Sequence, residues 1–270
     1  MNSNSLINRT ALVTGSAQGI GLAIATRLAA AGARIVLHDL AGNVHAAEAV
    51  AAVRGAGAPQ AIFIGGDLRD PRDIDGLMDK ALAWQGGIDI LVNNAGVQFT
   101  APVVDMPPER WDAILAVNLS SAFHTMRRAL PSMIARGFGR VVNIASVHGM
   151  VASAQKAPYV AAKFGLVGLT RVAALECAPL GTRESGGITA NCIAPGWTET
   201  SLIEPQIQGR ADQFGGDRAA GIRDMLREKQ PSLRMSTPAE IGELACMLCQ
   251  AWAHNINGTT IPVDGGWTAQ

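Results

Sequence analysis

Apolar runs of strand length alternate with longer helical patterns along most of the chain. The helical patterns lie at 19–32, about 44–54, 73–84, 107–116, 118–136 and 159–178. Strands that are apolar throughout are typical of a parallel sheet whose two faces are both covered by helices. The sequence therefore predicts an α/β fold with a doubly wound parallel sheet. Its strands are expected at 10–15, 33–39, 61–67, 88–96, 140–146 and 187–196, and 259–266 could supply a seventh.

The alternation continues without a linker, so we interpret residues 1–270 as a single domain. One segment departs from the pattern, because 201–235 is rich in glycine, glutamine and charged residues. It fits a small helical lid inserted over a site better than it fits part of the sheet. A second departure is 179–191, which looks longer than the usual connection between a helix and a strand.

Basic and acidic side chains balance, with 22 of each and a formal net charge of zero. A chain without net charge creates no positive electrostatic potential that would attract a phosphate backbone, so we expect no nucleic-acid partner. No apolar run reaches the roughly 18 residues of a membrane span, and 1–15 lacks the pattern of a secretory signal. We therefore expect a soluble cytoplasmic protein with no membrane partner.

The cysteines offer a second possible chemistry, because Cys246 and Cys249 form a CxxC pair. The pair lies in a helical segment with no second pair nearby, so buried reduced thiols explain it better than a zinc or redox site. We expect no metal site from the sequence.

A glycine-rich stretch, TGSAQGIG, follows the first predicted strand and leads into a helix. Gly15, Gly19 and Gly21 would let the backbone approach a pyrophosphate at the positive end of that helix, although an ordinary glycine-rich turn can look the same. Asp39 ends the second strand, where its carboxylate could accept hydrogen bonds from both adenosine ribose hydroxyls and repel a 2′-phosphate. A helix cap is the alternative for Asp39. The pattern predicts a dinucleotide site that prefers NAD to NADP.

Tyr159 and Lys163 are four residues apart on a predicted helix, so their side chains share a face. A lysine ammonium beside a phenol favours phenolate and lowers the tyrosine pKa from its usual ~10. A tyrosine tuned in this way can take a proton from an alcohol as hydride leaves its carbon. Ser146, at the end of the fifth strand, could bind the same oxygen, and Tyr159 is the only tyrosine of the chain.

Taken together, the motifs resemble the short-chain dehydrogenase/reductase family, in the family's order and over nearly the whole chain. They are TGSAQGIG, Asp67 in GGDL, NNAG at 93–96, Asn118 in VNLSSAF, Ser146 with YVAAK, and PGWTET at 195–200. The resemblance implies a Rossmann-like sheet of seven strands and a homotetramer. It also implies a catalytic tetrad in which Asn118 holds a water that links Lys163 to solvent, the other members being Ser146 and Tyr159.

The resemblance further implies which residues surround the cofactor. Asp67 and Leu68 would border the adenine, and Thr198 and Thr200 would hold the nicotinamide carboxamide. Some relatives bind a divalent ion near the C-terminal carboxylate, here that of Gln270, although no ligand cluster in the sequence supports one. The implied cofactor-binding set is Gly15, Gln18, Gly19, Ile20, Gly21, Asp39, Asp67, Leu68, Asn94, Gly96, Tyr159, Lys163, Pro195, Thr198 and Thr200.

Four further polar residues flank the motifs: Gln98, His148, Lys156 and Gln206. If they converge on one pocket, they suit a small carboxylate, which needs several hydrogen bonds to offset its desolvation. Trp197 and Trp267 would be apolar walls, or else core residues. The whole set is similar to that of family members that oxidise (R)-3-hydroxybutyrate to acetoacetate with NAD, which implies that activity here.

Two other functions stay open. A family member could act on another small hydroxy acid or reduce a 3-oxoacyl thioester, although the long arm of a thioester suits a small polar pocket poorly. A non-catalytic NAD-binding sensor is the more remote alternative, since it would have no need of Ser146, Tyr159 and Lys163 together.

Overall fold

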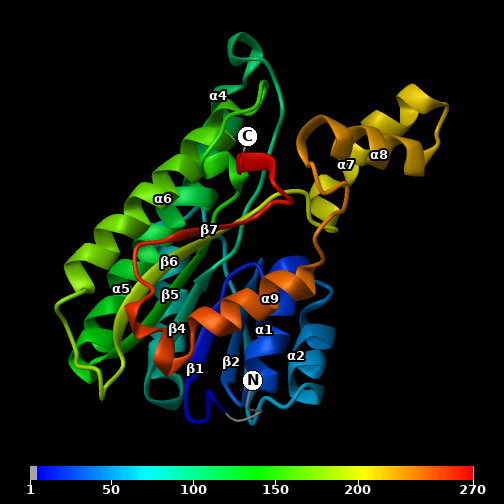
Figure 1. Cartoon of the computed structure of the whole chain (residues 1–270). Coiled ribbons are helices and arrows are strands. Elements are labelled where there is room, and N and C mark those ends of the chain that lie inside the picture. The colour runs from blue at the N-terminus through cyan, green and yellow to red at the C-terminus, as the bar shows by residue number, and fades with distance from the viewer. Residues whose placement is uncertain (1–4, 270) are drawn as a thin grey trace.

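The computed structural model describes residues 5–269 of the chain, so the expectations for residues 1–4 and for Gln270 lie outside it. In this range seven parallel strands form one sheet, as expected from the sequence, and their order is β3-β2-β1-β4-β5-β6-β7 (Figure 1). The strands are β1 (Thr10–Val13), β2 (Arg34–Asp39), β3 (Ala61–Gly65), β4 (Ile90–Asn93), β5 (Phe138–Ile144), β6 (Gly187–Pro195) and β7 (Thr260–Val263).

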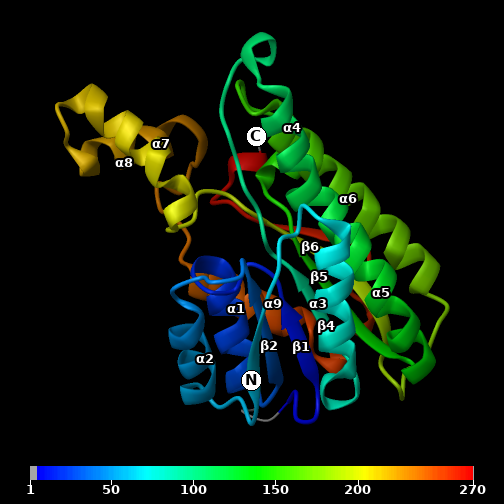
Figure 2. The same ribbon diagram turned by 180° about the vertical axis from the view of Figure 1, so that it is seen from behind.

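Helices cover both faces of the sheet (Figures 1 and 2). One face packs against α1 (Gly19–Ala30), α2 (Ala46–Gly55) and α9 (Pro238–Leu248). The other packs against α3 (Pro71–Ala83), α5 (Ser121–Arg136) and α6 (Ala157–Cys177), and α4 (Pro108–Leu115) lies beside α6. Among residues 5–269, no helix is long and apolar enough to cross a membrane.

The predicted lid is helical, as expected. It contains α7 (Glu204–Ala211) and α8 (Arg218–Lys229), which pack on each other and stand apart from the sheet and its helices (Figures 1 and 2). Arg210 on α7 pairs with Asp224 and Glu228 on α8, and Gly221 lets the two helices approach closely at Ala211.

Most strands end a few residues earlier, at their carboxyl ends, than the sequence predicts. The pairing of β1 ends at Val13, that of β3 at Gly65 and that of β4 at Asn93. The residues beyond these points leave the ladder and turn into loops at the same edge of the sheet. Tyr159 does not open its helix as predicted, because α6 begins two residues earlier at Ala157.

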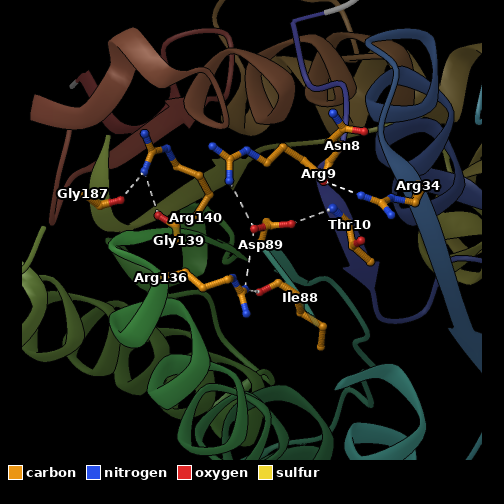
Figure 3. Close-up of polar contacts among 10 residues, drawn as sticks. All are labelled: Asn8, Arg9, Thr10, Arg34, Ile88, Asp89, Arg136, Gly139, Arg140 and Gly187. Atoms are coloured by element: carbon orange, nitrogen blue, oxygen red, sulfur yellow. Dashed lines mark hydrogen bonds and ion pairs between the residues drawn. The ribbon is translucent and has the colours of Figure 1, made fainter. Parts of the chain in front are cut away.

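At the amino-terminal edge of the sheet, buried charged side chains bond to backbone groups and to each other (Figure 3). Arg140 is fully buried and donates hydrogen bonds to backbone carbonyls that include those of Gly186 and Gly187, so it anchors the long connection before β6. Asp89 accepts from the backbone of Thr10 and pairs with Arg9 at 3.3 Å. The amino-terminal edge of the sheet is therefore fixed by internal partners, which leaves the carboxyl edge for a site.

Candidate active site

A cavity of about 630 Å³ lies at the carboxyl edge of the sheet, where the strand order reverses between β1 and β4. This switch point is where open α/β sheets bind ligands. Nearly all of the predicted site residues line it. They are Gly15, Gln18, Gly19, Ile20, Asp39, Asp67, Leu68, Asn94, Gly96, Gln98, Ser146, His148, Lys156, Tyr159, Lys163, Pro195, Trp197, Thr198, Thr200, Gln206 and Trp267.

Gly21 is predicted to contact the cofactor, but it does not line the cavity. A Cβ at Gly21 would lie 2.2 Å from the carbonyl oxygen of Gly15 and 2.5 Å from the amide nitrogen of Asn94. Asn94 donates from that nitrogen to the carbonyls of Thr14 and Gly15, at 2.9 and 2.8 Å. Gly21 therefore serves packing, because it lets α1 approach the turn that Asn94 holds.

The backbone of the glycine-rich turn, Gly15 to Gly19, has a conformation that suits binding of a pyrophosphate. Gly15 and Gly19 have φ of +61° and +59°, which is the left-handed region that favours glycine. No side chain caps the amino-terminal end of α1, so its first N–H groups are available to an anion. The turn therefore leaves backbone donors facing the cavity.

Asp39 and Asp67 lie together in the adjoining part of the cavity. The carboxylate of Asp39 accepts from the N–H of Leu40 at 2.9 Å and of Ala17 at 3.3 Å, so it is positioned by backbone. Asp67 pairs instead with Arg69, whose hydrogen bonds lower the pKa of that carboxyl. Sequence reasoning missed Arg69, which also lines the cavity.

Tyr159 and Lys163 lie on the inward face of α6, and both are buried. The Lys163 ammonium donates to the carbonyl of Ile144 at 2.8 Å and lies 5.6 Å from the centre of the Tyr159 ring. Burial lowers the pKa of Lys163 to about 8. The spacing thus places the two side chains as predicted.

The predicted lowering of the tyrosine pKa is wrong for the protein alone. Burial raises the pKa of Tyr159, and a hydrogen bond from Ser146 opposes that rise. Desolvation disfavours the phenolate more than its surroundings favour it. A cationic group added to the cavity would act in the opposite direction.

Asn118 does not line the cavity, and its predicted role as the residue that holds a relay water stays a prediction. It lies in a single π-helical turn, Ala116–Ser120, between α4 and α5. Its amide oxygen accepts from the N–H of Val97 at 2.9 Å, and its amide nitrogen donates to the Val97 carbonyl at the same distance. The side chain therefore fixes the strand-end loop that carries Gly96 and Gln98.

The four additional polar residues converge as predicted, since Gln98, His148, Lys156 and Gln206 all line the cavity. The Lys156 ammonium lies 5.2 Å from the centre of the Trp197 ring, and burial lowers its pKa to about 8. The side-chain oxygen of Gln206 is buried with no partner in the protein. A buried acceptor without a partner in a cavity marks a place for a polar ligand.

His148 also lies here, but both of its ring nitrogens have partners. Nδ1 is 3.3 Å from the hydroxyl of Ser146, and Nε2 is 3.0 Å from the hydroxyl of Ser153. Its ring meets Tyr159 and Trp267 edge to face. Burial lowers the pKa of His148 to about 3, so the ring is neutral. Sequence reasoning missed Ser153, since a serine five residues from a histidine in a loop carries no motif.

Comparisons with known proteins agree with this geometry. Residues 15–268 match the family model described as enoyl-(acyl carrier protein) reductase. The chain is 48% identical to a D-beta-hydroxybutyrate dehydrogenase of Cupriavidus necator, over 98% of the chain and 100% of the relative. It is 44% identical to a protein of the same name from Rhizobium meliloti, with the same shares covered.

A solved structure of a similar protein has the same fold. A gluconate 5-dehydrogenase from Burkholderia cenocepacia J2315, in complex with NADP and tartrate, matches with a TM-score of 0.86 and 35% identity. The match covers 99% of this chain and 98% of that one. The chain therefore belongs to the short-chain dehydrogenase/reductase family. It is an oxidoreductase of that family.

Proposed function

We propose that this enzyme oxidises (R)-3-hydroxybutyrate to acetoacetate with NAD. The observation that carries the proposal is the pairing of two chemistries in one cavity. Tyr159, Lys163 and Ser146 suit an alcohol, and Lys156 with two glutamines suits an acid group beside it. The names of the two relatives, whose matches cover 98% of this chain, point to the same substrate.

The chain's own residues would act at the two ends of the substrate. Tyr159 as phenolate takes the hydroxyl proton, Ser146 donates a hydrogen bond to that phenolate, and Lys163 stabilises the phenolate by its charge. Lys156, Gln98 and Gln206 hold the carboxylate and so fix which hydrogen faces the cofactor. When bound, NAD supplies the acceptor for the hydride that leaves the carbon.

The preference for NAD over NADP rests on Asp39. Its carboxylate is fixed by two backbone N–H groups in the cavity, where a ribose would lie beside the glycine turn. A 2′-phosphate there would place like charges together, and Arg69, a cation that lines the same cavity, is already paired with Asp67. The carboxylate therefore selects against the phosphorylated cofactor.

The alternative substrate is a 3-oxoacyl thioester, because the description of the matching family model names an acyl carrier protein. Lys156 and the two glutamines suit a free carboxylate, and a thioester carries no such charge. Reduction by NADH of acetoacetate and of acetoacetyl-CoA, measured in parallel, distinguishes the two. We expect acetoacetate to be reduced and acetoacetyl-CoA not, and the reverse result would refute the proposal.

We further propose that the enzyme is a cytoplasmic homotetramer. Exposed apolar side chains on α5 and α6, namely Phe123, Phe164, Val172 and Leu175, support association through those helices. All four cysteines are free and buried, which suits a reducing compartment. Light scattering should give four times the 28.1 kDa of one chain, and the mass of a single chain would exclude the tetramer.

A further inference from the structure

The hydroxyl of Ser146 has limited hydrogen-bonding capacity, and His148 uses much of it. A serine hydroxyl has one proton and two lone pairs. The backbone N–H of His148 donates to Ser146 Oγ at 3.2 Å, and the Nδ1 atom of the same residue is 3.3 Å away. If Nδ1 carries its proton, both lone pairs of Ser146 are filled and its own proton is left for Tyr159.

The other ring nitrogen decides whether Nδ1 carries that proton. His148 is neutral, so one nitrogen donates and the other accepts. Ser153 is half-buried, and its hydroxyl lies 3.0 Å from Nε2. When Ser153 donates to Nε2, the ring proton must lie on Nδ1 and point at Ser146.

We propose that Ser153 is a positioning residue that sets the tautomer of His148 and thereby directs the Ser146 proton to the Tyr159 oxygen. The hydrogen bonds then all run one way, from Ser153 to His148, from His148 to Ser146 and from Ser146 to Tyr159. A phenolate that receives this bond is stabilised, so the chain offsets part of the cost of burying it. The inference rests on the proposed function only in assigning Tyr159 as the base.

This assignment gives His148 a different task from carboxylate binding. A neutral ring whose single N–H is committed to Ser146 has no proton left to offer an acid group. Among residues 5–269, the charged groups near these hydrogen bonds are cationic. They are Lys156 before α6, Lys163 one turn beyond Tyr159 and Lys229 at the end of α8. Lys156 and Lys229 act on His148, Lys163 lies 5.6 Å from the centre of the Tyr159 ring, and a change at Ser153 leaves all three in place.

The ionisation of Tyr159 can be measured without any turnover, because it is the only tyrosine of the chain. Tyrosine labelled with carbon-13 at Cζ gives a single resonance whose pH titration reports the phenol pKa. We would compare the whole protein, saturated with NAD, as wild type, Ser153→Ala and Ser153→Thr. Ser132→Ala is the matched control, since Ser132 is a half-buried serine on α5 that bonds only its own helix.

We expect Ser153→Ala to raise the Tyr159 pKa by about one unit, the size of one lost hydrogen bond to a charged group. Ser153→Thr keeps the hydroxyl and should restore the wild-type value, and Ser132→Ala should not move it. In assays with (R)-3-hydroxybutyrate, Ser153→Ala should lower kcat about tenfold below the new pKa with KM unchanged.

An unshifted tyrosine titration in Ser153→Ala would overturn the proposal, and so would a shift that Ser153→Thr fails to reverse. If wild type does not oxidise (R)-3-hydroxybutyrate, the proposed substrate fails, yet the tyrosine titration still decides the role of Ser153. Thermal melting of each variant separates a loss of folding from a change in ionisation.

Discussion

At the scale of single residues, Lys156 carries the claim about the substrate. It is the cation of the substrate end of the cavity, it stacks over Trp197, and burial makes its charge costly. An ammonium desolvated by burial, in a cavity that two glutamines also line, is best explained by an anionic ligand that restores its lost hydration. The residue therefore links packing directly to specificity.

Lys156→Ala should raise KM for 3-hydroxybutyrate by tenfold or more, because a charge-assisted hydrogen bond contributes about 1.5–3 kcal/mol. Lys156→Met is the matched variant, since it keeps most of the packing on Trp197 and removes only the charge. Steady-state kinetics should show the same rise in KM for both. An unchanged KM in either variant would remove the carboxylate assignment.

The pH dependence of kcat/KM offers a separate check on Lys156. Its pKa is about 8, so the residue is charged below pH 8 and loses its proton above it. We expect KM for the substrate to rise, and kcat/KM to fall, as pH increases through that value, because kcat/KM reports the free enzyme. In Lys156→Arg, which stays charged, this loss should vanish. A fall that persists in the arginine variant would assign it to another group.

Asp39 decides cofactor choice at the same scale. Wild type should use NAD with at least tenfold higher kcat/KM than NADP, and Asp39→Ala should reduce this ratio toward one, because the like-charge repulsion of a 2′-phosphate is removed. Asp67→Ala, which alters the neighbouring carboxylate, is the control and should keep the preference. Equal use of the two cofactors by wild type would contradict the proposal.

At the scale of elements, the close approach of α1 to the glycine turn is a condition for the cofactor site. Gly21→Ala places a Cβ 2.2 Å from the Gly15 carbonyl, so the helix or the turn must move. We expect NAD binding, measured by calorimetry, to weaken by tenfold or more. Gly76→Ala on α3 is the control, because a Cβ there meets nothing within 4 Å. It should leave NAD binding unchanged and stabilise the fold by about 0.5–1 kcal/mol.

The elements also show where sequence patterns succeed and where they fail. Continuous apolar runs located the first six strands, because most of their residues are buried between two helical layers, whereas β7 at the edge is not buried and is predicted only as a possible strand. It could not show where pairing stops, because residues such as Thr14 and Asn94 leave the ladder through tertiary hydrogen bonds. The π-helical turn at Ala116–Ser120 is likewise invisible to a helical pattern, and it changes where Asn118 points.

The same distinction holds within the site. Tyr159 and Lys163 are placed by the spacing of one helix, so the sequence suffices to bring them together. The bond of Asn118 to Val97, and that of His148 to Ser153, depend on loops whose paths no local pattern encodes. Burial of Tyr159 is also a tertiary property, which is why the direction of its pKa shift was mispredicted.

At the scale of the whole molecule, the two edges of the sheet have different tasks. The amino-terminal edge satisfies its charges internally, through Arg140 with backbone carbonyls and Asp89 with Arg9. The carboxyl edge keeps buried polar atoms without partners, at Trp197, Thr198 and Gln206. Buried atoms without partners also occur elsewhere, at Arg34 Nε and Arg140 Nε among others, but only those of the cavity lie where a ligand could complete their hydrogen bonds.

The production of NADH from NAD with each enantiomer of 3-hydroxybutyrate tests the central claim most directly. Because Lys156 holds the acid group while Tyr159 meets the hydroxyl, only one enantiomer can present its carbon-bound hydrogen to the cofactor. We predict turnover of the (R) enantiomer, none of the (S) enantiomer, and loss of about 10²–10⁴-fold in Tyr159→Phe with NAD binding kept. Equal turnover of both enantiomers, or full activity in Tyr159→Phe, would contradict the account.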